Sequence, residues 1–391
     1  MHPNSDWFLI WLETDYPGEI VVTNGTETRP VVTWRTMGGP LKLHLLTASD
    51  VKSLLRKQMT MFTSNTGVSV SPPPHWSLGY HLCRSSGDSR DFRNDITGMS
   101  DASIPIQFDT DCIDEQLVKS AFELNPKFST LQNDFDKLKQ YKKSFLLPLV
   151  AQRSFDNSVG QSEGCLVEDS EPNSQCYMGK LMGENVMYPD MSKTDWLQRD
   201  FDKFLTKLDN ISNHQEVKGW HLHGSQPLDQ DSDSLCDNFQ YTPRDGDLRS
   251  GLLCQHAWVT SWNTSLVAGH ARYSHEVSLA FANLAEAKYQ FHEVFRYGGG
   301  HWAGHQGGKV GATWTGLGTS LREVLVLGMM GQAMVAMPVC GTHTVTDLDM
   351  PDMDLGKLCL RWAQLAAFMP AMRSWYADND NIRYLHHRQD H

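Results

Sequence analysis

The sequence has no long apolar run and no excess of basic residues. None of its apolar stretches approaches the roughly 20 residues that a membrane-spanning helix needs, so no membrane span is predicted. The formal net charge is -12, without the basic stripe that nucleic-acid-binding proteins carry. The first residues, MHPNSDWFLIWLETD, have neither the basic segment nor the small-residue cleavage site of a signal peptide. These absences argue against nucleic acid as a partner and against a membrane-spanning chain.

The residues that are present indicate a globular protein. An apolar content of 40%, with 12 Trp and 16 Phe, is far above that of a disordered chain. The length of 391 residues permits one large domain or two to three smaller ones. Glycosylation sequons begin at Asn24, Asn210 and Asn263, and there are 8 cysteines. Sequons occur by chance at about this frequency, so the cysteines are the better guide to the compartment.

The first part of the chain is predicted to be a β-structure followed by one helix. Residues 1–46 alternate apolar and polar side chains between Pro-Gly and Gly-Gly turns, which is typical of consecutive antiparallel strands. SDVKSLLRKQMTMF, residues 49–62, favours a helix with Ser49 as its N-cap. The three prolines of residues 69–76 indicate a linker, because proline fits neither a helix interior nor a central strand.

After this linker, short apolar runs alternate with helical patterns. Strands are expected at 76–82, 104–111, 144–152 and 217–223, and helices at 131–143, 193–208 and 272–291. Strands that alternate with helices predict a parallel sheet, and this many units favour an α/β fold of the (β/α) barrel type. The polar, Asp-rich residues 225–255 and 341–356 are expected to be inserted loops.

Several motifs resemble family 31 glycoside hydrolases, the group of acid α-glucosidase, maltase-glucoamylase and sucrase-isomaltase. PPPHWSLGYHLCR, residues 72–84, is similar to the start of that family's catalytic barrel, P-P-Y-W-x-L-G-F-H-L-C-R. TWRTMGGPLKLHLL, IPIQFDTD and MGKLMGENVMYPD resemble further family motifs in the same order. Residues 338–373 resemble its V-C-G-F to Y-P-F-M-R stretch. The resemblance therefore covers nearly the whole chain.

This resemblance implies an α/β fold with a (β/α)8 TIM-type barrel. Residues 1–62 would be the end of an N-terminal β-sandwich and its connecting helix, and residues 63–391 would be the barrel. The barrel is expected to be incomplete at its C-terminal end, lacking its last strand and the C-terminal β-domains. No cofactor is implied. The family implies the secretory pathway, in a lysosomal or extracellular location, although no signal peptide is present in this chain.

The cysteines fit the same resemblance. Cys236 with Cys254, and Cys340 with Cys359, match disulfide loops of the family. Cys165 and Cys176 could pair locally, and Cys83 is expected to be a buried free thiol. Two matched pairs favour an oxidising compartment over a metal site.

Both catalytic carboxylates of the family are missing from the aligned positions. A retaining glycosidase needs two carboxyl groups about 5 Å apart, a nucleophile and an acid/base. The family's nucleophile motif, W-I-D-M-N-E-P, aligns with residues 220–226, which puts Leu222 at the nucleophile position; a shift by one residue would put His223 there. Lys309 stands at the acid/base position, where its positive charge would oppose an oxocarbenium-like transition state.

Most of the family's sugar-binding groups are replaced as well. The aligned positions now carry Glu293, Trp375, Pro338 and Met182. The groups that match, and that the resemblance assigns to substrate binding, are Asp111, Trp220, His305 and Arg373.

Two other kinds of site, a zinc site and a phosphate loop, are disfavoured. His221 and His223 share one face of a strand and, with His301 and His305, would suit zinc, but no cysteine or carboxylate stands beside them at ligand spacing. The glycine-rich residues 298–309 lack the G-K-[ST] ending of a phosphate loop. No metal site is predicted.

The sequence therefore supports an α-glucosidase-like homologue in carbohydrate metabolism that is catalytically inactive. An α-glucoside or oligosaccharide is its expected ligand, and no protein partner is indicated. The alternative is an active retaining α-glucosidase with a displaced nucleophile, taken from Asp229, Asp231 or Asp233 in the inserted loop. A truncated product without a stable fold is the third hypothesis.

Overall fold

A computed structural model gives the structure of the chain, and its parts divide into two compact units. The first unit comprises Met1–Lys57, Ala151–Gln198 and Gly224–Ala280, and the second comprises Gln58–Val150, Arg199–His223 and Phe281–His391. The structure describes residues 7–16, 18–24, 30–36, 38–66, 72–84, 109–113, 118–120, 122–124, 131–154, 164–166, 175–181, 184–191, 193–211, 217–223, 225, 258–259, 262–284, 289–292, 303–306, 310–341 and 352–376.

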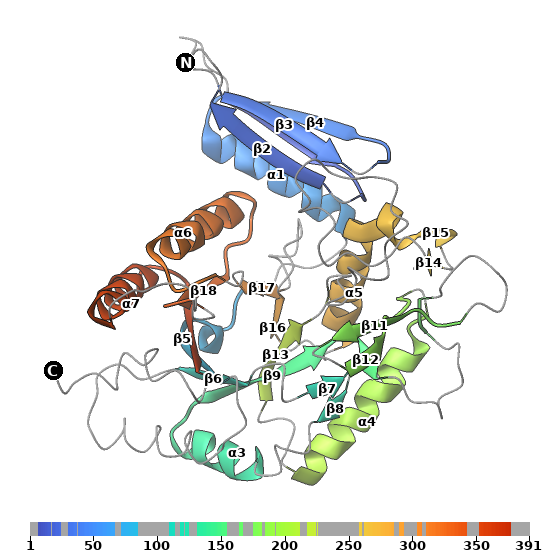
Figure 1. Cartoon of the computed structure of the whole chain (residues 1–391), viewed down its shortest axis with the longest axis vertical. Coiled ribbons are helices and arrows are strands. Elements are labelled where there is room, and N and C mark those ends of the chain that lie inside the picture. Colours follow the sequence, from blue (N-terminus) through green and yellow to red (C-terminus); the bar gives the residue numbers. More distant parts are fainter. Residues whose placement is uncertain are drawn as a thin grey trace. The chain divides into compact units, whose positions relative to one another are not determined.

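The second unit contains a closed barrel of eight parallel strands (Figure 1). Along the chain these are β5 (Gly79–Arg84), β6 (Thr110–Ile113), β9 (Ser144–Val150), β13 (Val217–His223), β16 (Tyr289–His292), β17 (Ala303–Gln306), β18 (Val335–Val339) and β19 (Ala371–Tyr376). Each strand pairs with the next along the chain, and β19 pairs with β5 to close the ring.

Near-continuous apolar sequence explains why these strands form the centre of the unit. In β9 every residue after Ser144 is buried, and all five residues of β18 are buried. Strands that are covered on both faces, by the barrel interior and by the surrounding helices, read as apolar runs rather than as an alternating pattern. Burial alone therefore does not tell which side chains point toward the barrel axis.

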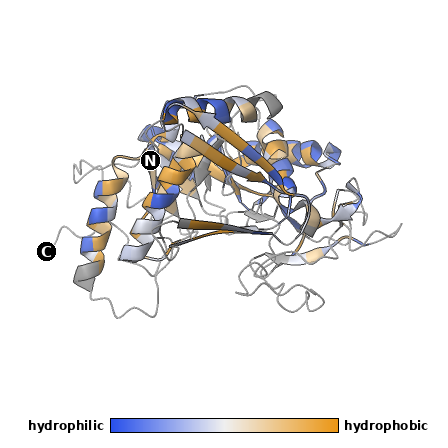
Figure 2. Cartoon of the chain, turned by 90° about the horizontal axis from the view of Figure 1, so that it is seen from above, coloured by the Kyte–Doolittle hydropathy of each residue, from blue (hydrophilic) through white to orange (hydrophobic). Residues whose placement is uncertain are grey.

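Helices of the second unit pack against the barrel strands. They include α3 (Leu131–Gln140), α6 (Trp314–Met329) and α7 (Asp352–Ala366). Helices in Figure 2 carry both hydrophilic and hydrophobic residues. Helices α6 and α7 lie beside β18, where Trp362, Leu358 and Met337 form a buried cluster (Figure 1). Helix α6 begins after Thr313, whose hydroxyl oxygen accepts a hydrogen bond from the Gly316 N–H at 2.9 Å.

The first unit holds short antiparallel sheets. Strand β1 (Trp7–Glu13) pairs with β4 (Lys42–Ala48), and β2 (Gly18–Asn24) pairs with β3 (Pro30–Thr36). The other strands of this unit are β10 (Arg153–Ser154), β11 (Met178–Leu181), β12 (Glu184–Met187), β14 (Trp258–Val259) and β15 (Thr264–Ser265). Three helices have residues in both units: α1 (Val51–Thr66), α4 (Asp195–Ile211) and α5 (His270–Leu284). In the second unit, β7 (Val118–Ser120) pairs with β8 (Glu123–Leu124).

The antiparallel strands expected before residue 46 and the helix after them are confirmed by β1 to β4 and by α1. That these strands end a β-sandwich, and that a domain boundary lies at residues 62 and 63, stay predictions. One expectation about the barrel is wrong: its last strand is not missing, because β19 closes the ring of eight.

Two predicted segments also need correction. The helix expected over 272–291 ends at Leu284, and its apolar end, Tyr289–His292, is strand β16. YQFH is buried throughout, and a short buried strand cannot be told from a buried helical turn by periodicity alone. The loop expected over 341–356 gives way to helix α7 at Asp352. In the part of the chain that the structure describes, no helix is long and apolar enough to cross a membrane.

Candidate active site

The pleat of strand β13 decides which of its side chains reach the barrel interior. The indole ring of Trp220 packs against Phe201 and Phe204 of helix α4, with ring centroids 5.8 and 6.3 Å apart. Trp220 therefore points outward, toward the helix layer. Successive side chains of a strand point to opposite faces, so Leu222 shares the outward face, whereas His221 and His223 face the interior.

Four side chains from three strands form a stacked column inside the barrel: His223 and His221 of β13, Arg373 of β19 and Phe291 of β16. The two imidazole rings lie 3.8 Å apart. Arg373 Nη1 lies 3.5 Å from Nδ1 and 3.4 Å from Nε2 of His221, so it faces the ring rather than a single nitrogen. The guanidinium carbon lies 5.0 Å from the centre of the Phe291 ring, as in a cation–π contact.

The stacked column is closed to solvent. His221 and Arg373 are each 1% exposed, His223 is 2% exposed and Phe291 is fully buried. Barrel interiors of this type are packed cores filled by side chains, and the column is part of that core. The two imidazole rings, the Phe291 ring and the Arg373 guanidinium group therefore fill the barrel interior where β13 ends.

His81 of strand β5 lies next to this column. Its ring meets Phe291 edge to face at 5.4 Å, and its Nε2 lies 2.9 Å from the carbonyl oxygen of Ser77. Because a carbonyl oxygen only accepts hydrogen bonds, Nε2 carries the proton. Burial, reinforced by the charge of Arg373, lowers the pKa of His81 to about 3. His81 is therefore a neutral hydrogen-bond donor, not a general acid, at physiological pH.

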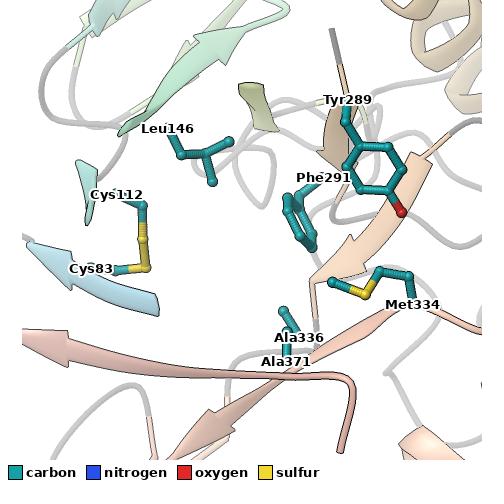
Figure 3. Close-up of a cluster of buried hydrophobic side chains, with 8 residues drawn as sticks. All are labelled: Cys83, Cys112, Leu146, Tyr289, Phe291, Met334, Ala336 and Ala371. Atoms are coloured by element: carbon teal, nitrogen blue, oxygen red, sulfur yellow. A yellow bond between two sulfur atoms is a disulfide. The ribbon is translucent and has the colours of Figure 1, made fainter. Parts of the chain in front are cut away.

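An apolar layer made of residues from several strands also fills the barrel (Figure 3). It contains Leu146, Tyr289 and Phe291 together with Met334, Ala336 and Ala371, and Trp76 packs against it. Cys83 and Cys112 belong to the same layer, and the close-up shows the bond between their sulfur atoms. Figure 3 also shows the Tyr289 ring beside Phe291, at a centroid distance of 5.6 Å.

The free thiol expected at Cys83 is therefore wrong, because Cys83 forms a disulfide with Cys112. The two residues are opposite each other on the neighbouring strands β5 and β6, 29 positions apart in sequence and with Cα atoms 4.5 Å apart. That distance is within the range that a disulfide requires. Sequence spacing alone cannot reveal such a pair, since it depends on which strands become neighbours.

Two other predicted pairings are confirmed. Cys340 is bonded to Cys359 and Cys165 to Cys176. The pairing of Cys236 with Cys254 lies outside the described residues and stays a prediction. Within the described part of the chain no cysteine is free.

The structure describes the side chains of some predicted catalytic and binding residues but not of others. Trp220, expected to contact sugar, is fully buried against helix α4 instead. Arg373 lies inside the barrel, as a sugar ligand would, but stacks on rings. Pro338 is buried in β18. Asp111 pairs in register with Leu82 of β5 and Phe145 of β9; its side chain, and those of His305 and Trp375, are not described.

The geometry favours His223 over Leu222 as the counterpart of a catalytic nucleophile. A nucleophile must point into the barrel mouth, and Leu222 faces the helix layer with Trp220. The alignment shifted by one residue is therefore the better of the two. This equivalence stays a prediction, as do the roles of Lys309, Glu293 and Met182, which lie outside the described residues together with His301 and the aspartates of residues 229–233.

Sequence reasoning did not single out His81, Phe291 or Cys112, all of which line the barrel interior. The alternation within GYHLCR would have put His81 and Cys83 on one face. Nothing in the sequence marked Phe291, because its segment resembled the end of a helix. Among the residues that the structure describes, no three His, Cys, Asp or Glu side chains gather as a metal site would require.

Comparison with known proteins identifies the family. The family model described as the glycosyl hydrolases family 31 TIM-barrel domain matches residues 70–386. This chain belongs to glycosyl hydrolase family 31. Its curated relatives include lysosomal alpha-glucosidase of Rattus norvegicus, 23% identical over 88% of this chain and 36% of the relative. Intestinal sucrase-isomaltase of Oryctolagus cuniculus is 23% identical over 89% of this chain and 20% of the relative.

Solved structures of family 31 proteins share the fold. The glucosidase II alpha subunit bound to alpha3-Glc2 superposes with a TM-score of 0.71 at 15% identity, over 94% of this chain and 39% of that chain. A family 31 alpha-glucosidase from Bacteroides thetaiotaomicron gives a TM-score of 0.66 at 16% identity, over 97% of this chain and 58% of that chain. The chain spans well under two thirds of these relatives, so similarity to them establishes family and fold and leaves activity open.

Proposed function

We propose that this chain is a catalytically inactive α-glucosidase-like member of glycosyl hydrolase family 31. The observation that carries the proposal is the composition of the barrel strands. Across all eight, as the structure describes them, the only acidic residue is Asp111. Retaining hydrolysis requires two carboxyl groups about 5 Å apart on either side of the scissile bond, and both need positions at the barrel mouth.

The stacked column supports the same proposal. Strand β13, which carries the family's nucleophile motif, ends in His223, and the inward side chains of this strand end lie in ring contact with one another. An imidazole of this kind cannot supply the carboxylate that forms the glycosyl intermediate.

We further propose that the ligand class is an α-glucoside or oligosaccharide, because relatives named lysosomal alpha-glucosidase and sucrase-isomaltase are similar in sequence over most of this chain. The assignment of binding to Asp111 rests on the aligned family motif alone, because its neighbour Cys112 is the residue of β6 that lies in the interior layer. The disulfides of the described residues support a secretory route, in a lysosomal or extracellular location, because such bonds persist in oxidising compartments.

Ligand binding can be tested separately from hydrolysis. The melting temperature of the protein would be measured with and without maltose or acarbose, in wild type and in the matched variants Asp111→Ala and Asp111→Asn. A ligand that binds only the folded state raises the melting temperature. We expect a shift in wild type that is lost in Asp111→Ala. An equal shift in both variants would remove Asp111 from the site, and no shift in wild type would remove the sugar ligand.

A further inference from the structure

The turn between strands β14 and β15 presents an asparagine at the surface. The two strands pair Trp258 with Ser265 and Val259 with Thr264, and Asn263 is the last residue of the connection. Its φ is 50°, in the left-handed region, which asparagine adopts more readily than most residues. Asn263 is exposed, whereas Thr264 and Ser265 are partly buried.

Contacts of the preceding residue hold this turn in place. The guanidinium carbon of Arg272 lies 4.3 Å from the centre of the Trp262 ring, and its Nε donates to Glu276 at 2.8 Å. Gly269 approaches the same ring so closely that a Cβ atom there would come within 2.6 Å of it. The tryptophan is therefore held from two sides, and the neighbouring asparagine keeps its exposed position.

Asn263-Thr264-Ser265 is an N-glycosylation sequon, with the required hydroxyl residue two positions after the asparagine. We propose that Asn263 carries an N-linked glycan. In this step Asn263 Nδ2 forms a bond to the anomeric carbon of a lipid-pyrophosphate-linked oligosaccharide. The bond from that carbon to the pyrophosphate oxygen breaks, the lipid pyrophosphate leaves with the electron pair, and the amide loses one proton.

A second observation, independent of the sequon, places the chain in the compartment where this transfer occurs. Within the first unit, Cys165 and Cys176 are joined by a disulfide, and such bonds form in the oxidising lumen of the secretory pathway. A bulky, polar glycan also requires an exposed acceptor in the folded protein, and Asn263, directly before strand β15, is exposed.

The other two sequons offer weaker geometry. Asn210 lies in the last turn of helix α4, and Asn24 is the last residue of strand β2. Both sequons continue into residues outside the described ranges, whereas every residue of the third is described. Glycosylation of Asn263 is independent of whether the barrel hydrolyses or binds a sugar.

The test uses the full chain directed into the secretory pathway of a eukaryotic host. The purified protein would be treated with peptide N-glycosidase in ¹⁸O-labelled water, which converts a glycosylated asparagine to labelled aspartate, and then mapped by mass spectrometry. We expect the label at Asn263. Variants Asn263→Gln and Ser265→Ala should each lose one glycan by electrophoretic mobility, while the matched control Ser265→Thr, which keeps the sequon, should retain it.

The variant Asn263→Gly removes the acceptor but keeps a residue that tolerates the left-handed backbone, so it separates loss of the glycan from damage to the turn. Its electrophoretic mobility and its melting temperature should equal those of Ser265→Ala. An unlabelled Asn263 peptide from protein whose Cys165–Cys176 bond has formed would overturn the proposal. So would a mobility shift that persists in both Asn263→Gln and Ser265→Ala.

Discussion

Removing the disulfide inside the barrel should cost several kcal/mol of stability. Cys83 and Cys112 are separated by 29 positions, and in the chain-entropy model a cross-link of that span lowers the entropy of the unfolded chain enough to stabilise by about 3.6 kcal/mol. Each cysteine is 1% exposed, so serine would bury an extra hydroxyl group and confuse the result. The perturbation is therefore the double variant Cys83→Ala with Cys112→Ala.

The matched control is the double variant Cys83→Val with Cys112→Val, which restores much of the lost volume without the cross-link. The free energy of unfolding would be measured from urea denaturation of all three proteins. The decrease in the free energy of unfolding that both double variants show is due to the lost cross-link. The difference in the free energy of unfolding between the alanine and valine variants is due to packing. A valine variant as stable as wild type would refute the reasoning, because the bond would then contribute nothing beyond filled space.

Three further outcomes are expected. Trp220→Ala should lower the free energy of unfolding by about 3 to 5 kcal/mol, because the ring is fully buried, and should leave any ligand-induced melting shift unchanged; a lost shift with normal stability would restore Trp220 as a sugar contact. His81 stays neutral in the fold, so wild-type stability should fall as pH drops from 6.5 toward about 3, by on the order of 5 kcal/mol, and His81→Gln should show a shallower urea-midpoint profile over that range; parallel profiles would exclude it as the cause. Thr313→Ala should cost about 1 kcal/mol through loss of the helix cap and Thr313→Ser should cost little, as measured by thermal melting; equal losses would contradict the cap.

The sequence predicts the (β/α) barrel but not the strand that closes it. Apolar strands alternating with helices predict parallel sheet units, and β9 and β13 lie where the pattern placed them. Four-residue strands such as β16 and β17 have too few residues to show a period, so the apolar pattern does not predict them. The expectation of a missing last strand came from the family resemblance, and it is wrong because Ala371–Tyr376 forms β19 and pairs with β5.

Strand β13 is predicted from the sequence and confirmed, whereas the residue of β13 that corresponds to the nucleophile stays a prediction. The alignment puts Leu222 there and the pleat favours His223, since a one-residue shift reverses every side chain. The contacts of Arg373 with His221 and Phe291 join residues far apart in sequence. They depend on which strands become neighbours in the closed barrel, and no local pattern encodes that.

The central claim, that the chain does not hydrolyse glucosides, is tested most directly by turnover of 4-nitrophenyl α-glucoside. Wild type would be compared with Asp229→Asn, Asp231→Asn and Asp233→Asn, after a cooperative melt has shown that each protein is folded. The account predicts release of nitrophenol no faster than in buffer for all four proteins. Turnover by wild type that any one of these substitutions abolishes would contradict it, and would identify a displaced nucleophile in that loop.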